Sequence, residues 1–199
     1  MVVVTFNYRV GAFGFLANAK VKADGELNVG LLDQRMLLQW VQRYIGQVCL
    51  SSTQNSLGKA DRHKFGGDPA HVVIDGASAG AASVMFHLAA YGGRNDNVFV
   101  GGITESVWTH SQPAVSELKF QFDTFVDASG CTTASNTMNC LRNANFTALW
   151  RADVATPYPG RTESPLFPYG PCIDNNFVKQ PLYEAFRAGK FVNIPMIIG

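Results

Sequence analysis

Residues 72 to 84 read VVIDGASAGAASV and join a short β-branched run, a serine between small residues and the start of an alanine-rich stretch. Valine and isoleucine favour strands, whereas alanine favours helices. The alanine-rich stretch continues to Tyr91 and is followed by Gly92 and Gly93, which is typical of a helix end. The order strand, tight turn, helix therefore decides the fold class of this region.

Alternating strands and helices are predicted on both sides of this unit. The β-branched run VVVTF at residues 2–6 fits a strand that is buried on both faces, as in a parallel sheet. Apolar residues recur at helical spacing from Leu31 to Ile45, which predicts an amphipathic helix. A further strand is predicted at 100–105 and a further helix at 114–128. This alternation indicates a doubly wound α/β fold with a mostly parallel central sheet and flanking helices.

The second half of the chain carries a proline-rich segment. Residues 156–171, TPYPGRTESPLFPYGP, contain five prolines and two glycines, so we expect an ordered but irregular surface loop that lines a cleft. Pro181 and Gly189 frame a short predicted helix. The run IPMII at residues 194–198 predicts a last apolar strand.

Composition and charge argue against several classes of protein. Apolar residues make up 47% of the 199 residues and charged residues 16%, which is enough material for a core and excludes a disordered chain. The net charge is +1 without a long basic run, which argues against nucleic acid and anionic membranes as partners. The sequence contains no apolar stretch of transmembrane length, and its start, MVVVTFNYRV, lacks the pattern of a signal peptide.

The four cysteines are Cys49, Cys131, Cys140 and Cys172. They are too few and too scattered for a disulfide scaffold, and none of them forms a CxxC pair of the kind that binds zinc. Cys131 and Cys140 are nine residues apart. Spacing alone leaves two alternatives open: a disulfide across a chain that folds back, or two ordinary small apolar residues. Asn145 begins an N-x-S/T sequon and is a candidate glycosylation site if the chain is secreted.

The pentapeptide Gly76-Ala77-Ser78-Ala79-Gly80 matches G-x-S-x-G and stands where the predicted strand meets the predicted helix. A nucleophile elbow requires this context, because small neighbours let strand and helix pass closely while the serine backbone is strained. The helix N-terminus would add partial positive charge, and the backbone N–H of Ala79 could donate to an oxyanion. The alternative is a turn in which the serine has only a structural role. We favour a nucleophile at Ser78.

Five stretches carry a family resemblance, and they follow one another in the family's order: TFNYRVGAFGFL (5–16), NVGLLDQRMLLQWVQRYIGQ (28–47), FGGDPAHVVIDGASAGAASV (65–84), GPCIDNNFV (170–178) and GKFVNIPMIIG (189–199). Together they resemble the type-B carboxylesterase/lipase family, which includes cholinesterases and secreted fungal lipases. The resemblance implies an α/β-hydrolase fold, hydrolysis of small-molecule or lipid carboxylic esters without cofactor or metal, and secretion of the full-length protein. It also implies that Ser78 is the nucleophile and Ala79 an oxyanion donor.

The same resemblance assigns structural roles to two further pairs. Cys131 and Cys140 fall where many members have a small disulfide-closed loop. Arg9 and Asp33 fall where members commonly have a salt bridge under the active site, although two unrelated surface charges remain the alternative for them.

The departures from the family pattern are as informative as the match. Members usually have glutamate before the serine, and this chain has Ala77 there. The resemblance puts the Gly-rich oxyanion loop before Met1, the triad acid just beyond Gly199 and the triad histidine further on. We therefore expect residues 1–199 to be a partial domain, truncated at both ends and nearly inert alone, since loss of a triad costs on the order of 10⁶ in kcat. The alternatives are a noncatalytic cholinesterase-like binding module and a nonfunctional truncated gene product.

Two side chains within the chain are candidates for the pocket around the serine. His110 follows the strand predicted at 100–105, whose end should open near Ser78, so it could line the pocket or act as a substitute base. Glu105 ends the same strand and could be a displaced acid, with a structural carboxylate as the alternative. His87 is nine residues beyond Ser78 on the predicted helix, about 13 Å away, which is too far for a hydrogen bond.

The polar segment at 48–64, VCLSSTQNSLGKADRHK, interrupts the family-like register between YIGQ and FGGDP. Its 17 residues correspond to 51 nucleotides, and Val48-Cys49 and Lys64 can be encoded by bases that resemble the two ends of a short intron. Two explanations are open: a translated intron, or a genuine surface insertion, which costs little loop-closure entropy.

We expect mature transcripts to lack these 51 nucleotides, because removing residues 48–64 restores the register. RNA sequencing reads that cross the junction measure this directly. The intron hypothesis is wrong if all mature transcripts retain the segment; if it is correct, Cys49 and His63 carry no function.

Overall fold

The computed structural model describes residues 1–46 and 65–199, so the suspected insertion at 48–64, with Cys49 and His63, lies outside the described residues. Helices make up most of the regular structure in the described ranges. In chain order the elements are α1 (Gly11–Phe15), α2 (Ala19–Asp24), α3 (Val29–Tyr44), η1 (Pro69–His71), β1 (Val73–Ala77), α4 (Ala79–Gly93), β2 (Gly101–Glu105), η2 (Val115–Leu118), α5 (Lys119–Ala128), α6 (Thr137–Asn143), α7 (Phe146–Ala152), α8 (Leu182–Arg187) and β3 (Met196–Ile198).

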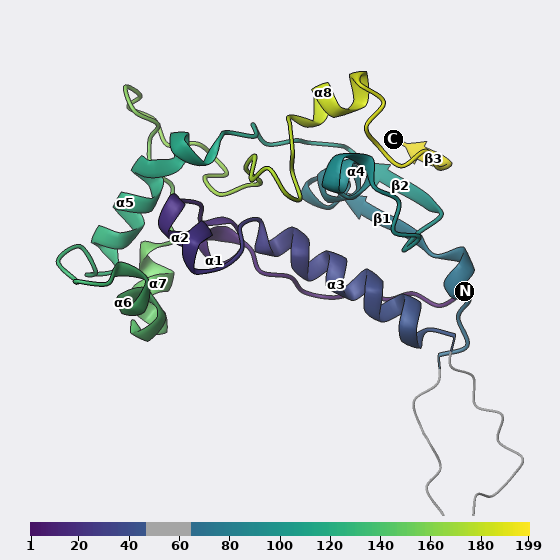
Figure 1. Ribbon diagram of the computed structural model, residues 1–199, viewed down its shortest axis with the longest axis horizontal. Coiled ribbons are helices and arrows are strands. Elements are labelled where there is room, and N and C mark those ends of the chain that lie inside the picture. Colours follow the sequence, from purple (N-terminus) through teal and green to yellow (C-terminus); the bar gives the residue numbers. More distant parts are fainter. Residues whose placement is uncertain (47–64) are drawn as a thin grey trace, which may run out of the picture.

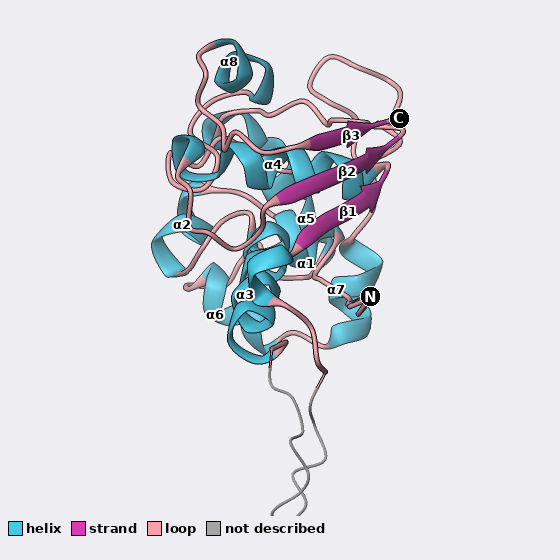
Figure 2. Ribbon diagram, turned by 90° about the vertical axis from the view of Figure 1, so that its right-hand side faces the viewer, coloured by secondary structure: helices cyan, strands magenta, loops and turns pink. Residues whose placement is uncertain are grey.

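The three strands form one parallel sheet in the order β1-β2-β3. Ile74 of β1 lies opposite Gly102 of β2, which in turn lies opposite Met196 of β3. Parallel neighbours need a crossover connection, and α4 supplies the one between β1 and β2. α4 packs across one face of these strands (Figure 1, Figure 2). The α/β layering predicted from the sequence is therefore confirmed.

Most of the other helices gather at the end of the molecule away from the sheet (Figure 1). α1, α5, α6 and α7 surround an apolar core that contains Phe122, Phe125 and Leu141. α3 runs from this group towards the sheet, and it packs with α4 and α8 around a separate core that contains Leu31 and Phe177. None of the helices in the described ranges has both the length and the apolar character needed to cross a membrane.

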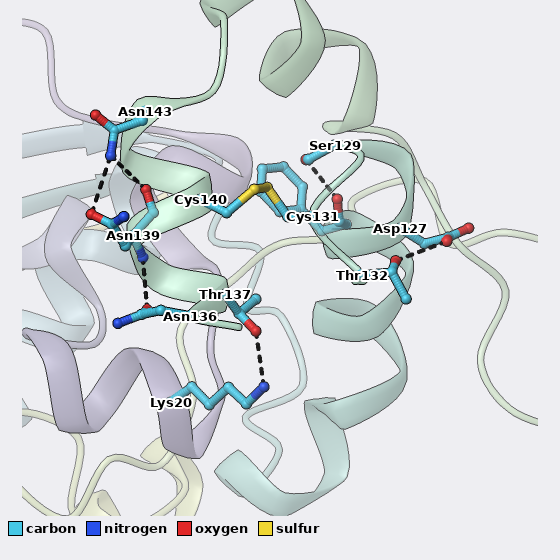
Figure 3. Close-up of a disulfide and its surroundings, with 11 residues drawn as sticks. Lys20, Asp127, Ser129, Cys131, Thr132, Asn136, Thr137, Asn139, Cys140 and Asn143 are labelled. Carbon is cyan, nitrogen blue, oxygen red and sulfur yellow. Dashed lines mark hydrogen bonds between the residues drawn. A yellow bond between two sulfur atoms is a disulfide. The ribbon is translucent and has the colours of Figure 1, made fainter. Parts of the chain in front are cut away.

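A disulfide joins Cys131 to Cys140 and fixes α6 against the end of α5 (Figure 3). Of the two alternatives that spacing left open, the bridge is therefore the correct one. The ammonium of Lys20 on α2 donates a hydrogen bond to Thr137 Oγ1 at the start of α6, at 3.0 Å. The disulfide loop is thus held both covalently and through α2.

Several predicted elements are confirmed with shifts of a few residues. α3, β1, α4, β2, η2 with α5, α8 and β3 occupy the segments where the pattern predicted them. Residues 156–171 form the expected irregular loop without helix or strand. The backbone of α4 leaves helical geometry at Ala90–Gly92, close to the glycines that predicted its end.

The strand predicted at residues 2–6 is wrong. The first ten residues are extended but form no ladder with any described residue, and Val3 keeps 69% of its surface exposed. They run alongside α3 (Figure 1), and a cavity of about 690 Å³ lies between them and β1. A strand forms only where a neighbouring backbone pairs with it, so the apolar run alone was not sufficient.

Buried polar side chains connect α3 to α4. His87, which is 3% exposed, places Nε2 3.0 Å from Gln34 Oε1, and the Gln34 amide donates to Ser83 Oγ at 3.0 Å. Because the Gln34 oxygen is an acceptor, Nε2 of His87 carries the proton. His87 Nδ1 has no partner within the described part of the chain. Burial, together with the charge of Arg35, lowers the pKa of His87 from 6.5 to about 3.

Acidification should therefore destabilise the fold through His87. The unfolded chain binds a proton at this residue below pH 6.5 while the folded chain does not until about pH 3, so stability is present above pH 6.5 and falls as the pH drops below it. We expect a loss of about 2 kcal/mol between pH 8 and pH 5. Urea unfolding across this range measures it. His87→Gln should remove this loss, whereas His71→Gln, at an exposed histidine, should keep it; equal pH profiles for the two variants would contradict the assignment.

Candidate active site

Ser78 occupies the sharp turn between β1 and α4 in a strained backbone conformation. Its φ is 53° and its ψ is −114°, a combination that L-residues rarely adopt. The N–H of Ser78 donates to the carbonyl oxygen of Glu105 at 2.9 Å, and its own carbonyl accepts from the N–H of Ala82 at 3.0 Å. The turn is thus fixed from β2 on one side and from α4 on the other, and it leaves the side chain of Ser78 exposed.

Gly76 allows this turn to form. A Cβ at position 76 would stand 2.3 Å from the carbonyl carbon of Gly80 and 2.9 Å from the nitrogen of Ala81. Both are backbone atoms of α4 and cannot move aside cheaply. A Cβ at Gly80 would meet no atom within 4 Å, so the second glycine of the motif is not required for space.

An apolar cavity of about 350 Å³, a volume typical of small-molecule sites, is lined by Ala79, the residue that follows the serine, whereas Ser78 itself is not part of the lining. We call it the elbow cavity. Its lining comes from α4, from the N-terminal segment, from α3 and from the chain after β2 and α7, and it consists of Tyr8, Val10, Gly11, Phe15, Leu31, Ala79, Ala82, Ser83, Phe86, Trp108, His110, Asp153 and residues 167–171. The proline-rich loop therefore lines a cavity, as the sequence predicted. Trp108 packs against Phe167 with ring centroids 5.0 Å apart, which joins the two sides of the cavity.

His110 lines the elbow cavity but does not contact the serine. Its Nε2 lies 2.7 Å from the carbonyl oxygen of Phe167, and its Nδ1 lies 2.7 Å from that of Ser111. Both ring nitrogens thus face acceptors other than Ser78. No side chain in the described ranges forms a hydrogen bond with Ser78 Oγ, so the structure does not bring His110 and Ser78 together as base and nucleophile.

Glu105 and Ala77 stand opposite each other at the ends of β2 and β1. Both are exposed, and it is the backbone carbonyl of Glu105 that supports the serine turn, not its carboxylate. Asn145 is also exposed, and its side-chain oxygen accepts the N–H of Thr147 to begin α7.

Arg9 and Asp33 form an ion pair that anchors the N-terminal segment to α3. Arg9 Nη2 lies 2.7 Å from Asp33 Oδ1, and Arg9 Nε lies 2.8 Å from Asp33 Oδ2. These hydrogen bonds hold the pKa of the Asp33 carboxyl below its usual value. The carbonyl oxygen of Arg9 also packs so closely on Gly14 and Gly30 that a Cβ there would approach it to 2.1 and 2.5 Å. A role of this pair in supporting the active site stays a prediction.

Asp153 is the cavity residue that sequence reasoning missed. It follows α7, and its Oδ1 accepts the N–H of Ala12 at 3.0 Å, across 141 residues of chain. No motif or periodicity marked it, because only the packing of α1 on α7 brings it to the cavity. Within the described ranges, no group of three His, Cys, Asp or Glu side chains could hold a metal ion.

A strained serine between a parallel strand and a helix is characteristic of the α/β-hydrolase fold, and here that helix, α4, also lines an apolar cavity. The crystal structure of Aspergillus niger EstA supports this fold, with a TM-score of 0.86 and 43% sequence identity over 96% of this chain and 34% of that one. The model of the carboxylesterase family matches residues 1–49 and 59–199. The chain belongs to the carboxylesterase family.

Curated relatives agree with this membership. Lipase 5 of Diutina rugosa is 38% identical over 98% of this chain and 34% of its own length. Secreted lipase 1 of Botryotinia fuckeliana is 36% identical over all of this chain and 33% of its own length. The chain therefore spans about a third of the length of these relatives.

The two glycines of the motif should differ sharply in their tolerance of a side chain. Gly76→Ala should lower the free energy of unfolding by about 3 kcal/mol, because the new methyl group overlaps the backbone of α4. Gly80→Ala is the matched control and should change it by less than about 1 kcal/mol, since alanine is the better helix former. Urea unfolding measures both. Equal destabilisation by the two substitutions would show that the close approach at Gly76 is not the constraint.

Proposed function

We propose that the protein that carries residues 1–199 hydrolyses carboxylic esters through an acyl-enzyme formed on Ser78 Oγ. The strained and exposed serine turn, held by hydrogen bonds from both sides, is the observation that supports this most strongly. A serine with only a structural role would need neither the strain nor the exposure. Membership of the carboxylesterase family supports the same reaction.

The chemistry follows from what surrounds the hydroxyl. Ser78 Oγ attacks the ester carbonyl, whose oxygen becomes an oxyanion. The bond from the carbonyl carbon to the alkoxy oxygen then breaks, and the alcohol leaves with the proton that the serine gave up. Water cleaves the acyl-enzyme, which releases the carboxylic acid and restores the serine hydroxyl. Ala79 is the first residue of α4, and the first N–H groups of a helix have no partner within it. Its N–H and the positive end of the α4 dipole are therefore available to stabilise the oxyanion.

Removal of the Ser78 proton needs a base. Since no described side chain forms a hydrogen bond with Ser78 Oγ, the proposal assigns the base and its acidic partner to residues outside the described ranges. Without them the hydroxyl is a weak nucleophile.

The relatives suggest the substrate class and the compartment. They include proteins named lipases, a secreted triacylglycerol lipase of Gibberella zeae and a carboxylesterase of Aspergillus clavatus. Ester substrates fit the apolar lining of the elbow cavity. The Cys131–Cys140 disulfide and the relatives named as secreted support an oxidising, extracellular setting for the parent protein.

A fluorophosphonate probe tests the nucleophile. The protein to use is the longest chain encoded by the gene that contains residues 1–199. In it we expect the probe to label Ser78. The Ser78→Ala variant should lose this label, and its esterase activity should fall by a factor on the order of 10⁶. Ser164→Ala is the matched control, because Ser164 is exposed like Ser78 but does not precede a helix. This variant should keep full labelling. If the wild-type protein stays unlabelled while a known serine hydrolase in the same tube reacts, the proposed function is wrong.

A further inference from the structure

Among the described residues that line the elbow cavity, Asp153 is the one acidic side chain, and none is a lysine or an arginine. Its Oδ1 is occupied by the N–H of Ala12. Its Oδ2 packs over the Cα of Gly11, where a Cβ would come within 2.1 Å of that oxygen, and it has no hydrogen-bond partner among the described residues. One oxygen of the carboxylate is thus fixed, and the other remains available to a bound molecule.

Asp153 is half-buried beside apolar side chains. Phe15, Leu31 and Phe86 belong to the same cavity lining, and burial raises the pKa of Asp153 despite the opposing hydrogen bond from Ala12. Burial and the charge of Asp153 also raise the pKa of the neighbouring Tyr169. A carboxylate in such a place gains more from a hydrogen-bond donor than it would in water.

We propose that Asp153 selects esters whose acyl chain carries a hydroxyl group at the end remote from the ester, an inference that rests on the proposed hydrolysis at Ser78. The proposal places the acyl carbonyl beside Ala79, which belongs to the cavity lining, and the acyl chain in the elbow cavity that opens from there. A terminal hydroxyl donates to Asp153 Oδ2. A terminal methyl group would displace water from that oxygen without donating a hydrogen bond in its place. The oxygen would then have no hydrogen-bond donor, and polar sites reject apolar analogues for this reason.

The same carboxylate disfavours a negative chain end. A terminal carboxylate would meet Asp153 in an environment of low polarity, with no described lysine or arginine in the lining to offset the repulsion. The selectivity therefore has two parts, a preference for a hydroxyl over a methyl end and a rejection of a carboxylate end. Both parts depend on the carboxylate of Asp153.

The test compares kcat/KM for p-nitrophenyl ω-hydroxyacyl esters with that for p-nitrophenyl esters in which a methyl group replaces the hydroxyl, over several chain lengths. The protein is the longest chain that the gene encodes with residues 1–199. At the length that reaches Asp153, we expect the hydroxyl ester to be preferred about tenfold, the effect of a hydrogen bond to a charged group. Asp153→Leu should abolish this preference.

Asp153→Asn keeps an acceptor for the Ala12 N–H, so it separates selectivity from folding. It should weaken the hydroxyl preference and remove the discrimination against a p-nitrophenyl ester with a terminal carboxylate. Asp123→Asn, at an exposed acid of α5 outside the cavity lining, is the control and should change neither ratio.

The two proposals fail in different ways. If Ser78→Ala retains activity, the proposed function is wrong. If Ser78 is essential but the wild-type protein prefers the methyl ester at every length, or the Asp153 variants keep the wild-type ratios, the assignment to Asp153 is overturned.

Discussion

The close approach of β1 and α4 at Gly76 is the constraint on which most of the described structure depends. It lets α4 lie directly across β1 and β2, and it forces the chain to reverse at Ser78 with a positive φ. The contacts that α4 makes with the cavity and with α3 depend on that placement. Its first turn brings Ala79 and Ala82 to the elbow cavity, and its middle brings His87 to the side chain of Gln34 on α3. A wider spacing at Gly76 would therefore alter the serine turn, the cavity and the α3 contact together.

A second set of buried hydrogen bonds fixes the other wall of the cavity. Asn28 has a φ of 53° and is 2% exposed, and its amide donates to the carbonyl of Cys172 at 2.9 Å and to Asp174 Oδ2 at 2.8 Å. Its side-chain oxygen accepts the N–H of Cys172. These bonds tie the start of α3 to the segment that follows the proline-rich loop. Because that loop ends at the tied segment, residues 167–171 are held against the cavity although they form no helix or strand.

The parts of this structure that could be predicted are the local ones. Helical spacing located α3, and the sequence from 72 to 84 located β1, the turn and α4, since each depends on neighbours within a few residues. The strand at 2–6 was wrong because strand formation depends on a distant partner that composition does not reveal. The Cys131–Cys140 bridge stayed undecided from spacing and was indicated only by family resemblance. Asp153 was missed altogether, since its contact with Ala12 spans 141 residues and no pattern encodes such a contact.

Alanine at position 77 changes how charge is distributed around the serine. A carboxylate there would stand next to the serine that we propose as the nucleophile, close to the oxyanion that would form on the carbonyl oxygen of the ester, and like charges in a poorly solvated site oppose each other. With Ala77 at this position, the acid opposite it on the sheet is Glu105, whose side chain is exposed while its backbone carbonyl supports the turn. In the part of the chain that the structure describes, the acid that lines the cavity is Asp153, which follows α7. In the proposed reaction, the amide N–H groups at the start of α4 would therefore act on the oxyanion without a carboxylate at position 77 to oppose them. The carboxylate that we propose to discriminate between substrates follows α7, a different element from the turn that carries the proposed nucleophile.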